Sequence, residues 1–271
     1  MKLALKLSGK VLDEPALRRA LGRQAASLAK AGHQLVLIHG AGKQLNDFCR
    51  GQGIPVQQIQ GRRVTDTETL RAAVLVFSGV NADLTVALLA AGVQAVGLAG
   101  FAGGLTVGRR RPPLKLMLQG PEGPQEQIVD FGWVGEIVET NPHLIELLWS
   151  SGVIPVISSL CAQGDQILNI NADTLASELA VALGVDRLIA VSDVEGIYRD
   201  PSVPTSRIPH MTAAEARRHL AEGVFEDGMV PKVENALRLL DRGVPEFQVI
   251  SGMGEDLARC LEEGTGTLLV A

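Results

Sequence analysis

The sequence has few cysteines and few aromatic residues, and both shortages narrow what the protein can be. Cys49, Cys161 and Cys260 lie far apart and form no Cys-x-x-Cys pair, so neither a zinc site nor a disulfide framework is indicated. Aromatic residues make up 3% of the chain and apolar residues 46%. The core is therefore expected to consist of Ala, Val, Leu and Ile, as where helices pack on a parallel sheet.

Excess positive charge, long apolar runs and two common nucleotide motifs are also lacking. The formal net charge is −5, which argues against a nucleic-acid partner because such partners bind basic patches. No uninterrupted run of 18 apolar residues occurs, and no leader is apparent before the first apolar stretch. We therefore expect a cytoplasmic protein without membrane contact. Neither glycine-rich turn near the N-terminus fits a P-loop or a dinucleotide-binding fingerprint.

The chain does contain an alternation of short apolar strands and helical patterns. A strand, a glycine-containing turn and a helix follow one another twice near the N-terminus, and the alternation resumes after residue 130. This order predicts an α/β fold with a largely parallel sheet. Expected strands include 3–7, 34–39, 93–98, 134–138, 153–160, 187–191 and 247–250. Expected helices include 14–30, 67–91 with a break near Gly79, 141–150, 212–221 and 230–241.

Two glycine turns, Ser8-Gly9-Lys10 and 40–42, each follow a strand and precede a helix. Uncovered N–H groups and the positive end of the helix dipole suit phosphate or carboxylate oxygens at such turns. Both turns should open at the same edge of the sheet. One such turn is weak evidence for a phosphate site, and the two together favour it.

Two amides and an acid gather at a corner between strand and helix. Asn169, Asn171 and Asp173 follow a buried strand and a short hairpin, and a helical pattern begins at Thr174. Asp173 is expected at the N-cap. Residue types alone allow either a ligand site or an ordinary turn with a helix cap.

Two arginine clusters lie in expected loops. Arg62-Arg63 precedes the 67–91 helix, where a guanidinium could hold a carboxylate through two hydrogen bonds. Arg109-Arg110-Arg111 falls in a predicted exposed hairpin over 106–117. We expect that triplet to be a solvated tip and assign it no role.

In their order along the chain these segments resemble the amino acid kinase family, and within it the enzymes that phosphorylate N-acetylglutamate. The similarity covers residues 6 to 267. It rests on six short motifs: Lys-Leu-Ser-Gly at 6–9, His-Gly-Ala-Gly at 39–42, Gly-x-Arg-Val-Thr-Asp at 61–66, Asn-Ile-Asn-Ala-Asp at 169–173, Ser-Asp-Val-x-Gly-Ile at 192–197 and Gly-Met-x-x-Lys-Val at 228–233.

The resemblance implies a single domain over 1–271, folded as a three-layer αβα sandwich around a largely parallel central sheet. The acyl amino acid would bind a lobe formed by 1–175, and ATP a lobe formed by 176–271. The implied reaction transfers the γ-phosphoryl group of ATP to the side-chain carboxylate of N-acetyl-L-glutamate, a step of arginine biosynthesis. Mg²⁺ would arrive with the nucleotide rather than in a cage of protein ligands.

Site residues are implied in three groups. The catalytic residues would be Lys6 and Lys232, which neutralise charge on the phosphoryl group in transfer, and Asp173, which holds both lysines. The substrate would contact Gly40, Ala41, Gly42, Arg63 and Asn169. ATP would contact Gly9, Asp193, Val194, Glu195, Gly196, Ile197, Tyr198, Val224, Phe225 and Glu226.

The motifs depart from the family pattern at several positions. Ser8 stands where the family usually has the first glycine of Lys-x-Gly-Gly, and Ala41 replaces the middle glycine of His-Gly-Gly-Gly. Ser8 is also compatible with a uridylate kinase, although residues 63–66 and 169–173 fit that enzyme poorly. The Gly100–Gly104 segment lacks the Lys-Asp often found there, which leaves substrate contacts of the nearby hairpin undefined.

Two further activities are compatible with this fold. One is an acetylaminoadipate kinase of lysine biosynthesis, whose substrate is one methylene longer. The other is a binding module without catalysis, which retention of Lys6, Lys232 and Asp173 disfavours. Arginine-inhibited hexamers of the family carry an extra helix before the first strand, whereas the first strand here begins near residue 2. We therefore expect a homodimer, joined through 67–91 and insensitive to arginine.

Overall fold

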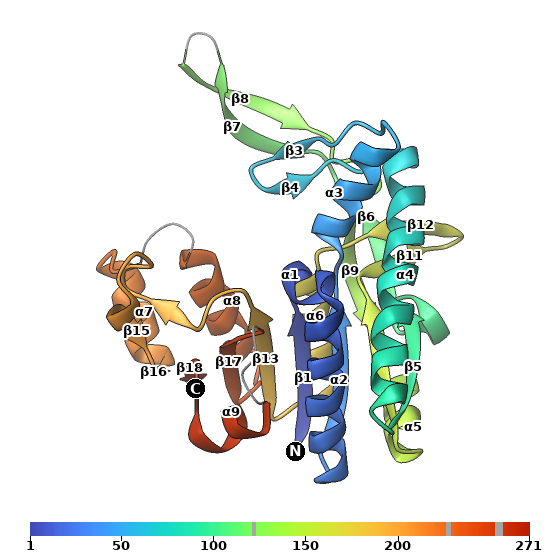
Figure 1. Cartoon of the computed structure of the whole chain (residues 1–271). Coiled ribbons are helices and arrows are strands. Elements are labelled where there is room, and N and C mark those ends of the chain that lie inside the picture. The colour runs from blue at the N-terminus through green and yellow to red at the C-terminus, as the bar shows by residue number, and fades with distance from the viewer. Residues whose placement is uncertain (121–122, 226–228, 253–256) are drawn as a thin grey trace.

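In the computed structural model, which describes residues 1–120, 123–225, 229–252 and 257–271, eight strands form one central sheet (Figure 1). Neighbouring strands are parallel except for β17 and β18, which are antiparallel. The largely parallel sheet predicted from the sequence is thus confirmed. In spatial order the strands are β16 (His210–Thr212), β18 (Thr267–Val270), β17 (Glu246–Ser251), β13 (Arg187–Ser192), β1 (Lys2–Leu7), β2 (Gln34–His39), β10 (Val153–Ser158) and β5 (Gln94–Ala99).

Helices cover both faces of the sheet and complete the predicted three layers. One core cluster joins Leu3, Leu5 and Leu7 of β1 to α1, α2, α4 and α9, and another joins Ala4 to α5, α6, α7 and α8. Successive residues of a strand point to opposite faces, so apolar residues at almost every position suit burial on both sides. The helices are α1 (Gly9–Asp13), α2 (Pro15–Lys30), α3 (Gly42–Gly51), α4 (Thr67–Ala90), α5 (His143–Ser150), α6 (Ala172–Leu183), α7 (Ala213–Ala221), α8 (Val230–Asp241) and α9 (Leu257–Glu263).

Helix α4 is continuous, so the predicted break at Gly79 is wrong. A Cβ at Gly79 would meet nothing within 4 Å, which places this residue on the open face of the helix. One glycine costs a helix about 1 kcal/mol, whereas Phe77, Leu84 and Leu88 bury their side chains in the core. Packing therefore outweighs the local preference.

The same helix has the length and mean apolarity of a segment that could cross a membrane. Within the described part of the chain no other helix meets that criterion. Here α4 packs against α2, α3, β5 and β10, and Leu84 and Leu88 are 1% exposed. Burial in the core therefore accounts for part of its apolar composition, whereas Leu75, Val86 and Leu89 remain exposed.

A smaller sheet and three short strand pairs surround the carboxyl ends of the central strands. The smaller sheet has the order β12 (Gln166–Asn169), β11 (Leu160–Gln163), β6 (Thr106–Arg110) and β9 (Gly135–Thr140). The pairs are β3 (Gln58–Ile59) with β4 (Arg62–Arg63), β7 (Leu114–Gly120) with β8 (Gly123–Val129), and β14 (Ile197–Tyr198) with β15 (Arg207–Ile208). Among the described residues there are also two 3₁₀ turns, η1 (Ala102–Gly104) and η2 (Pro204–Ser206).

The predicted hairpin over 106–117 with an arginine tip is wrong. β6 and β7 belong to different sheets, and the hairpin that projects from the body is β7–β8 (Figure 1). Arg109 and Arg111 form ion pairs with Glu136, and Arg110 with Asp130. These carboxylates lie about 20 or more positions away along the chain, so local sequence gave no sign of the pairing.

Candidate active site

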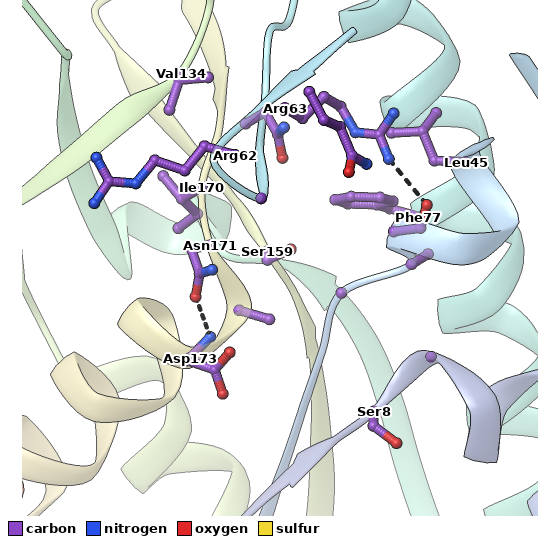
Figure 2. A pocket seen from close by; sticks show the side chains of 18 of the residues that line it. Ser8, Leu45, Arg62, Arg63, Phe77, Val134, Ser159, Ile170, Asn171 and Asp173 are labelled. Atoms are coloured by element: carbon purple, nitrogen blue, oxygen red, sulfur yellow. Dashed lines mark hydrogen bonds between the residues drawn. The ribbon is translucent and has the colours of Figure 1, made fainter. Parts of the chain in front are cut away.

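A cavity of about 340 Å³ opens beside the carboxyl ends of β1 and β2 (Figure 2). Both predicted glycine turns contribute to its lining, as do Arg62, Arg63 and the segment 169–173. The prediction that both turns open at one edge of the sheet is therefore confirmed. Parallel strands bring their carboxyl ends together there, which is where ligands bind in α/β proteins.

The start of α6 differs from the prediction, because Asn171 is the N-cap and not Asp173. The Oδ1 atom of Asn171 accepts from the N–H groups of Asp173 at 2.7 Å and Thr174 at 3.1 Å. Asn171 has the extended backbone typical of an N-cap, with φ −69° and ψ 132°. Asp173 lies in the first turn of α6, and its carboxylate is not used for capping.

That carboxylate forms an ion pair with Lys6, with Oδ1 2.8 Å from Nζ. The Lys6 side chain is 19% exposed and comes from β1, the central strand next to β2. The N-terminal end of a helix stabilises a carboxylate in its first turn. The ion pair therefore holds the Lys6 ammonium group at the carboxyl-terminal edge of the parallel sheet.

A second cavity of about 140 Å³ shares Lys6 and Asp173 with the first. Its other lining includes Ser192 at the end of β13, and Lys232 and Asn235 on α8. All three predicted catalytic residues thus line the second cavity, and two of them, Lys6 and Asp173, also line the first. Asn235 was not singled out from the sequence, although its spacing of three from Lys232 places it on the same side of a helix.

Arg63 reaches from β4 to the start of α3. One of its terminal nitrogens, Nη2, donates to the Gly42 carbonyl at 2.9 Å and to Asn46 Oδ1 at 2.5 Å. The other, Nη1, is buried without a hydrogen-bond partner among the described groups. Burial lowers the pKa of this guanidinium below its ordinary value, and a buried donor without an acceptor is costly. An anionic ligand in the cavity would remove that cost.

Asn169 also lines the first cavity. Its Nδ2 donates to Thr65 Oγ1 at 3.1 Å, and its backbone N–H donates to the Trp133 carbonyl at 2.9 Å. These bonds join the smaller sheet to the segment that carries Arg63. The fold therefore brings Asn169, Arg63 and the two glycine turns to one cavity.

Comparison with known proteins agrees with this geometry. Residues 1–251 match the sequence profile described as the amino acid kinase family. The chain belongs to the amino acid kinase family. It is 42% identical over 273 residues to an acetylglutamate kinase of Sorangium cellulosum, covering 99% of this chain and 94% of that protein. A second acetylglutamate kinase, from an Anaeromyxobacter species, is 39% identical over 273 residues, covering 99% of this chain and 98% of that protein.

A solved structure shares the fold. The N-acetylglutamate synthase of Neisseria gonorrhoeae, complexed with coenzyme A and N-acetyl-glutamate, superposes with a TM-score of 0.80 at 24% identity. The match covers 100% of this chain and 59% of the synthase chain. At this identity the likeness concerns the fold of the amino acid kinase family.

The glycine turn after β1 is supported from α3. Gln44 Nε2 donates to the Gly9 carbonyl at 2.9 Å, so the two turns of this amino acid kinase domain are tied together. Ser8 lines the first cavity, and its hydroxyl is buried without a hydrogen-bond partner among the described groups. Its backbone N–H donates to the Val191 carbonyl at 3.0 Å.

The predicted nucleotide segment divides into exposed and buried parts. Asp193 and Glu195 are exposed and Val194 is half-buried, whereas Gly196, Ile197 and Tyr198 are buried. Within the described chain this segment contributes no lining to the second cavity; its neighbour Ser192 does. Val224 is half-buried, Phe225 belongs to the core, and Glu226 lies outside the described residues. The roles of these residues toward ATP stay predictions.

Thr267 fastens the same segment to the C-terminal strand. Its hydroxyl accepts from the Ile197 N–H at 2.7 Å and donates to the Ile208 carbonyl at 2.6 Å. Gly196 has φ 156°, and a Cβ there would lie 2.5 Å from Thr267 Oγ1, so glycine is required. Local sequence could not reveal this contact, because the partners lie 70 positions apart.

Proposed function

We propose that the protein is an acetylglutamate kinase. It transfers the γ-phosphoryl group of ATP to the side-chain carboxylate of N-acetyl-L-glutamate, producing an acyl phosphate for arginine biosynthesis. The observation that carries this proposal is the Lys6–Asp173 pair at the boundary between two cavities. The names of relatives that match nearly the whole chain support the choice of substrate.

In this mechanism the first cavity holds the acyl amino acid and the second borders the site of the ATP phosphates. An oxygen of the side-chain carboxylate attacks the γ-phosphorus, a new P–O bond forms, and the bond to the β–γ bridging oxygen breaks to release ADP. Lys6 and Lys232 neutralise charge that spreads over the phosphoryl oxygens and the leaving group. Asp173 keeps Lys6 in place through the 2.8 Å ion pair.

The remaining site residues orient the substrate. We place the α-carboxylate at Arg63, whose Nη1 is buried and unpaired among the described groups, because a guanidinium matches the geometry of a carboxylate. Asn169 would bind the amide side of the substrate. N–H groups of the Gly9 and Gly40–Gly42 turns would donate to the attacking carboxylate and the phosphoryl oxygens. Holding the reactants in line supplies much of the rate enhancement of such transfers.

The nucleotide would occupy a C-terminal lobe of residues 176–271, and the acyl amino acid a lobe of residues 1–175. Asp193 to Tyr198, with Val224 to Glu226, would form the adenosine side. Within the described residues no group of three or more His, Cys, Asp or Glu side chains could hold a metal ion. Mg²⁺ fits best as an ion held by the ATP phosphates and water, where it would offset phosphate charge.

An assay with four acceptors in parallel tests the proposal. N-acetylglutamate, N-acetylaminoadipate, aspartate and UMP are each supplied with ATP and Mg²⁺, and acyl phosphate is trapped with hydroxylamine while ADP is measured. We expect N-acetylglutamate to give the highest kcat/KM, with N-acetylaminoadipate about 10-fold to 200-fold lower, because one methylene is worth about 1–3 kcal/mol. A preference for N-acetylaminoadipate would instead identify the protein as an acetylaminoadipate kinase of lysine biosynthesis. Absence of turnover with every acceptor would favour a binding module.

We also propose a cytoplasmic homodimer formed through α4. An exposed stripe of this helix runs from Arg71 through Leu75, Ser78, Ala82, Val86 and Leu89. The charged neighbour of Ala82, Asp83, forms an ion pair with Arg18. Leu75 is 65% and Val86 62% exposed. The spacing of three and four residues suits helix-to-helix packing, and small residues at the centre allow close approach. A second copy would cover this stripe through a two-fold interface.

Replacing Ala82 by arginine is therefore expected to give a monomer, because the bulky cation would separate the two helices. Light scattering at several concentrations measures the change. Val203→Glu is the control, since Val203 is 42% exposed in the segment between β14 and β15, and β15 lies on the opposite side of the molecule from α4 (Figure 1). A wild-type monomer, or a dimer that persists in Ala82→Arg, would contradict the proposed interface.

A further inference from the structure

A buried histidine lies directly before the second glycine turn and has no role in the mechanism above. His39 is the last residue of β2, and its side chain is 0% exposed. One ring nitrogen, Nδ1, lies 3.2 Å from the Gly40 carbonyl oxygen. The other, Nε2, lies 3.2 Å from Nδ2 of Asn81 on α4. Both ring nitrogens are therefore engaged.

These two contacts are compatible with a single state of the ring. A carbonyl oxygen only accepts, so Nδ1 carries the proton and donates to Gly40. The Asn81 NH₂ group only donates, so Nε2 is the unprotonated acceptor. Burial lowers the pKa of His39 to about 4, which keeps the ring neutral and consistent with this assignment near neutral pH.

Asn81 is held by more than the histidine. Its Nδ2 also lies 3.1 Å from the Leu98 carbonyl oxygen and 3.0 Å from the Val156 carbonyl oxygen. Three acceptors around one atom identify it as the amide nitrogen, whose two hydrogens are shared among the two carbonyls and His39 Nε2. The facing residue of β5 is Gly97, where any Cβ would overlap the Asn81 side chain. The fold therefore accommodates a buried asparagine in a mostly apolar helix, at a position where an apolar side chain would avoid a desolvation cost.

The bond to Gly40 has a consequence for the peptide that follows. No described peptide bond is cis, and in a trans peptide the C=O and the next N–H point in opposite directions. Fixing the Gly40 carbonyl toward His39 therefore fixes the direction of the Ala41 N–H. Within the described chain this N–H donates to no protein acceptor. Ala41 is 0% exposed and lines the first cavity, so the N–H is a buried donor that a ligand oxygen in the cavity would satisfy.

We propose that His39, held in one tautomer by Asn81, is a positioning residue that orients the Gly40–Ala41 peptide so that the Ala41 N–H donates to an oxygen of the transferring phosphoryl group. The inference rests on the proposed kinase function. His39 itself touches neither substrate. Its effect is to pre-set one hydrogen-bond donor, so the donor need not reorganise during the reaction.

Two substitutions of His39 separate this role from simple packing. The Nδ2 of His39→Asn can take the place of Nδ1 and keep a donor to Gly40. His39→Gln instead reaches toward Asn81 and lacks a donor at the nearer position. We expect His39→Asn to keep kcat within about 3-fold of wild type, and His39→Gln to lose about 10-fold or more, because small misplacements at a reacting centre can cost that much. KM for both substrates should change little.

Thermal unfolding of both variants shows whether lost activity follows lost stability. Equal kcat values for the two variants, or losses that simply track Tm, would overturn the proposal. Wild-type turnover in the same assay tests the kinase function separately. A wild-type protein without activity would refute that function, and the state of His39 would then be tested by the NMR measurement described next.

The tautomer can be measured without any substrate. Long-range ¹H–¹⁵N NMR spectra of the wild-type protein distinguish a protonated Nδ1 from a protonated Nε2. We expect His39 to carry its proton on Nδ1, and Asn81→Leu to weaken this preference, because the variant keeps the Gly40 acceptor but loses the donor to Nε2. A wild-type His39 protonated on Nε2 would refute the inference whatever the outcome of the kinetic assays.

Discussion

Lys232→Ala and Lys6→Ala are each expected to lower kcat by about 100-fold or more, while KM for either substrate changes much less. Each lysine stabilises charge that is greatest in the transition state, and removing one such preorganised group commonly costs a few kcal/mol. Steady-state kinetics with N-acetylglutamate and ATP measures both constants. Lys30→Ala is the matched control, since Lys30 is exposed at the end of α2 and lines neither cavity.

The Lys6 variant has a second expected consequence. Without the ammonium group, Asp173 loses the partner that lies 2.8 Å from its Oδ1. Lys6→Ala should therefore also disturb the position of the Asp173 carboxylate, whereas Lys232→Ala leaves the Lys6–Asp173 pair in place. If both variants kept near-normal kcat and showed only raised KM values, the proposed transition-state role would be wrong.

Arg63→Lys is expected to raise KM for N-acetylglutamate by roughly 10-fold to 100-fold and to leave KM for ATP nearly unchanged. A hydrogen bond to a charged group is worth about 1.5–3 kcal/mol, and lysine cannot provide the paired donors of a guanidinium. Initial rates measured against each substrate in turn give the two constants. Arg50→Lys, an exposed arginine on α3 that pairs with Asp47, serves as the matched control.

Arg63 also supports the protein itself, through its bonds to the Gly42 carbonyl and Asn46. The lysine variant can therefore loosen the start of α3, and thermal unfolding measures that effect. An equal rise in both KM values, with a lowered Tm, would indicate a damaged fold. Unchanged KM for N-acetylglutamate would show that the α-carboxylate binds elsewhere.

Much of the architecture could be predicted from the sequence, because its strands are buried on both faces. In β1 the apolar residues Leu3, Ala4 and Leu5 are consecutive, and each has a helix layer to pack against. Such runs between turn residues identify central strands of α/β folds. The glycine turns after β1 and β2 could also be recognised in the sequence. Their position at one edge followed from the parallel sheet.

Predictions from local sequence were wrong where a segment allows two conformations, or where residues distant in the sequence determine the structure. The segment Asn-Ile-Asn-Ala-Asp offers two possible caps for α6, and the extended backbone at Asn171 selects the earlier one. Gly79 suggests a break that the packing of α4 overrides. Arg109 to Arg111 resemble a solvated tip until the fold places Asp130 and Glu136 beside them.

The sequence by itself determined the types and order of the elements, the parallel sheet and the motifs of the amino acid kinase family. Those features depend on local periodicity and on short runs of residues. Both can be recognised in the sequence without knowledge of tertiary contacts. Only the tertiary structure decided that Lys6, Asp173 and Lys232 line one cavity, and that Asn81 of α4 holds His39. Such contacts depend on the strand order, in which β1 lies between β13 and β2. Long-range packing sets this order, and no local pattern encodes it.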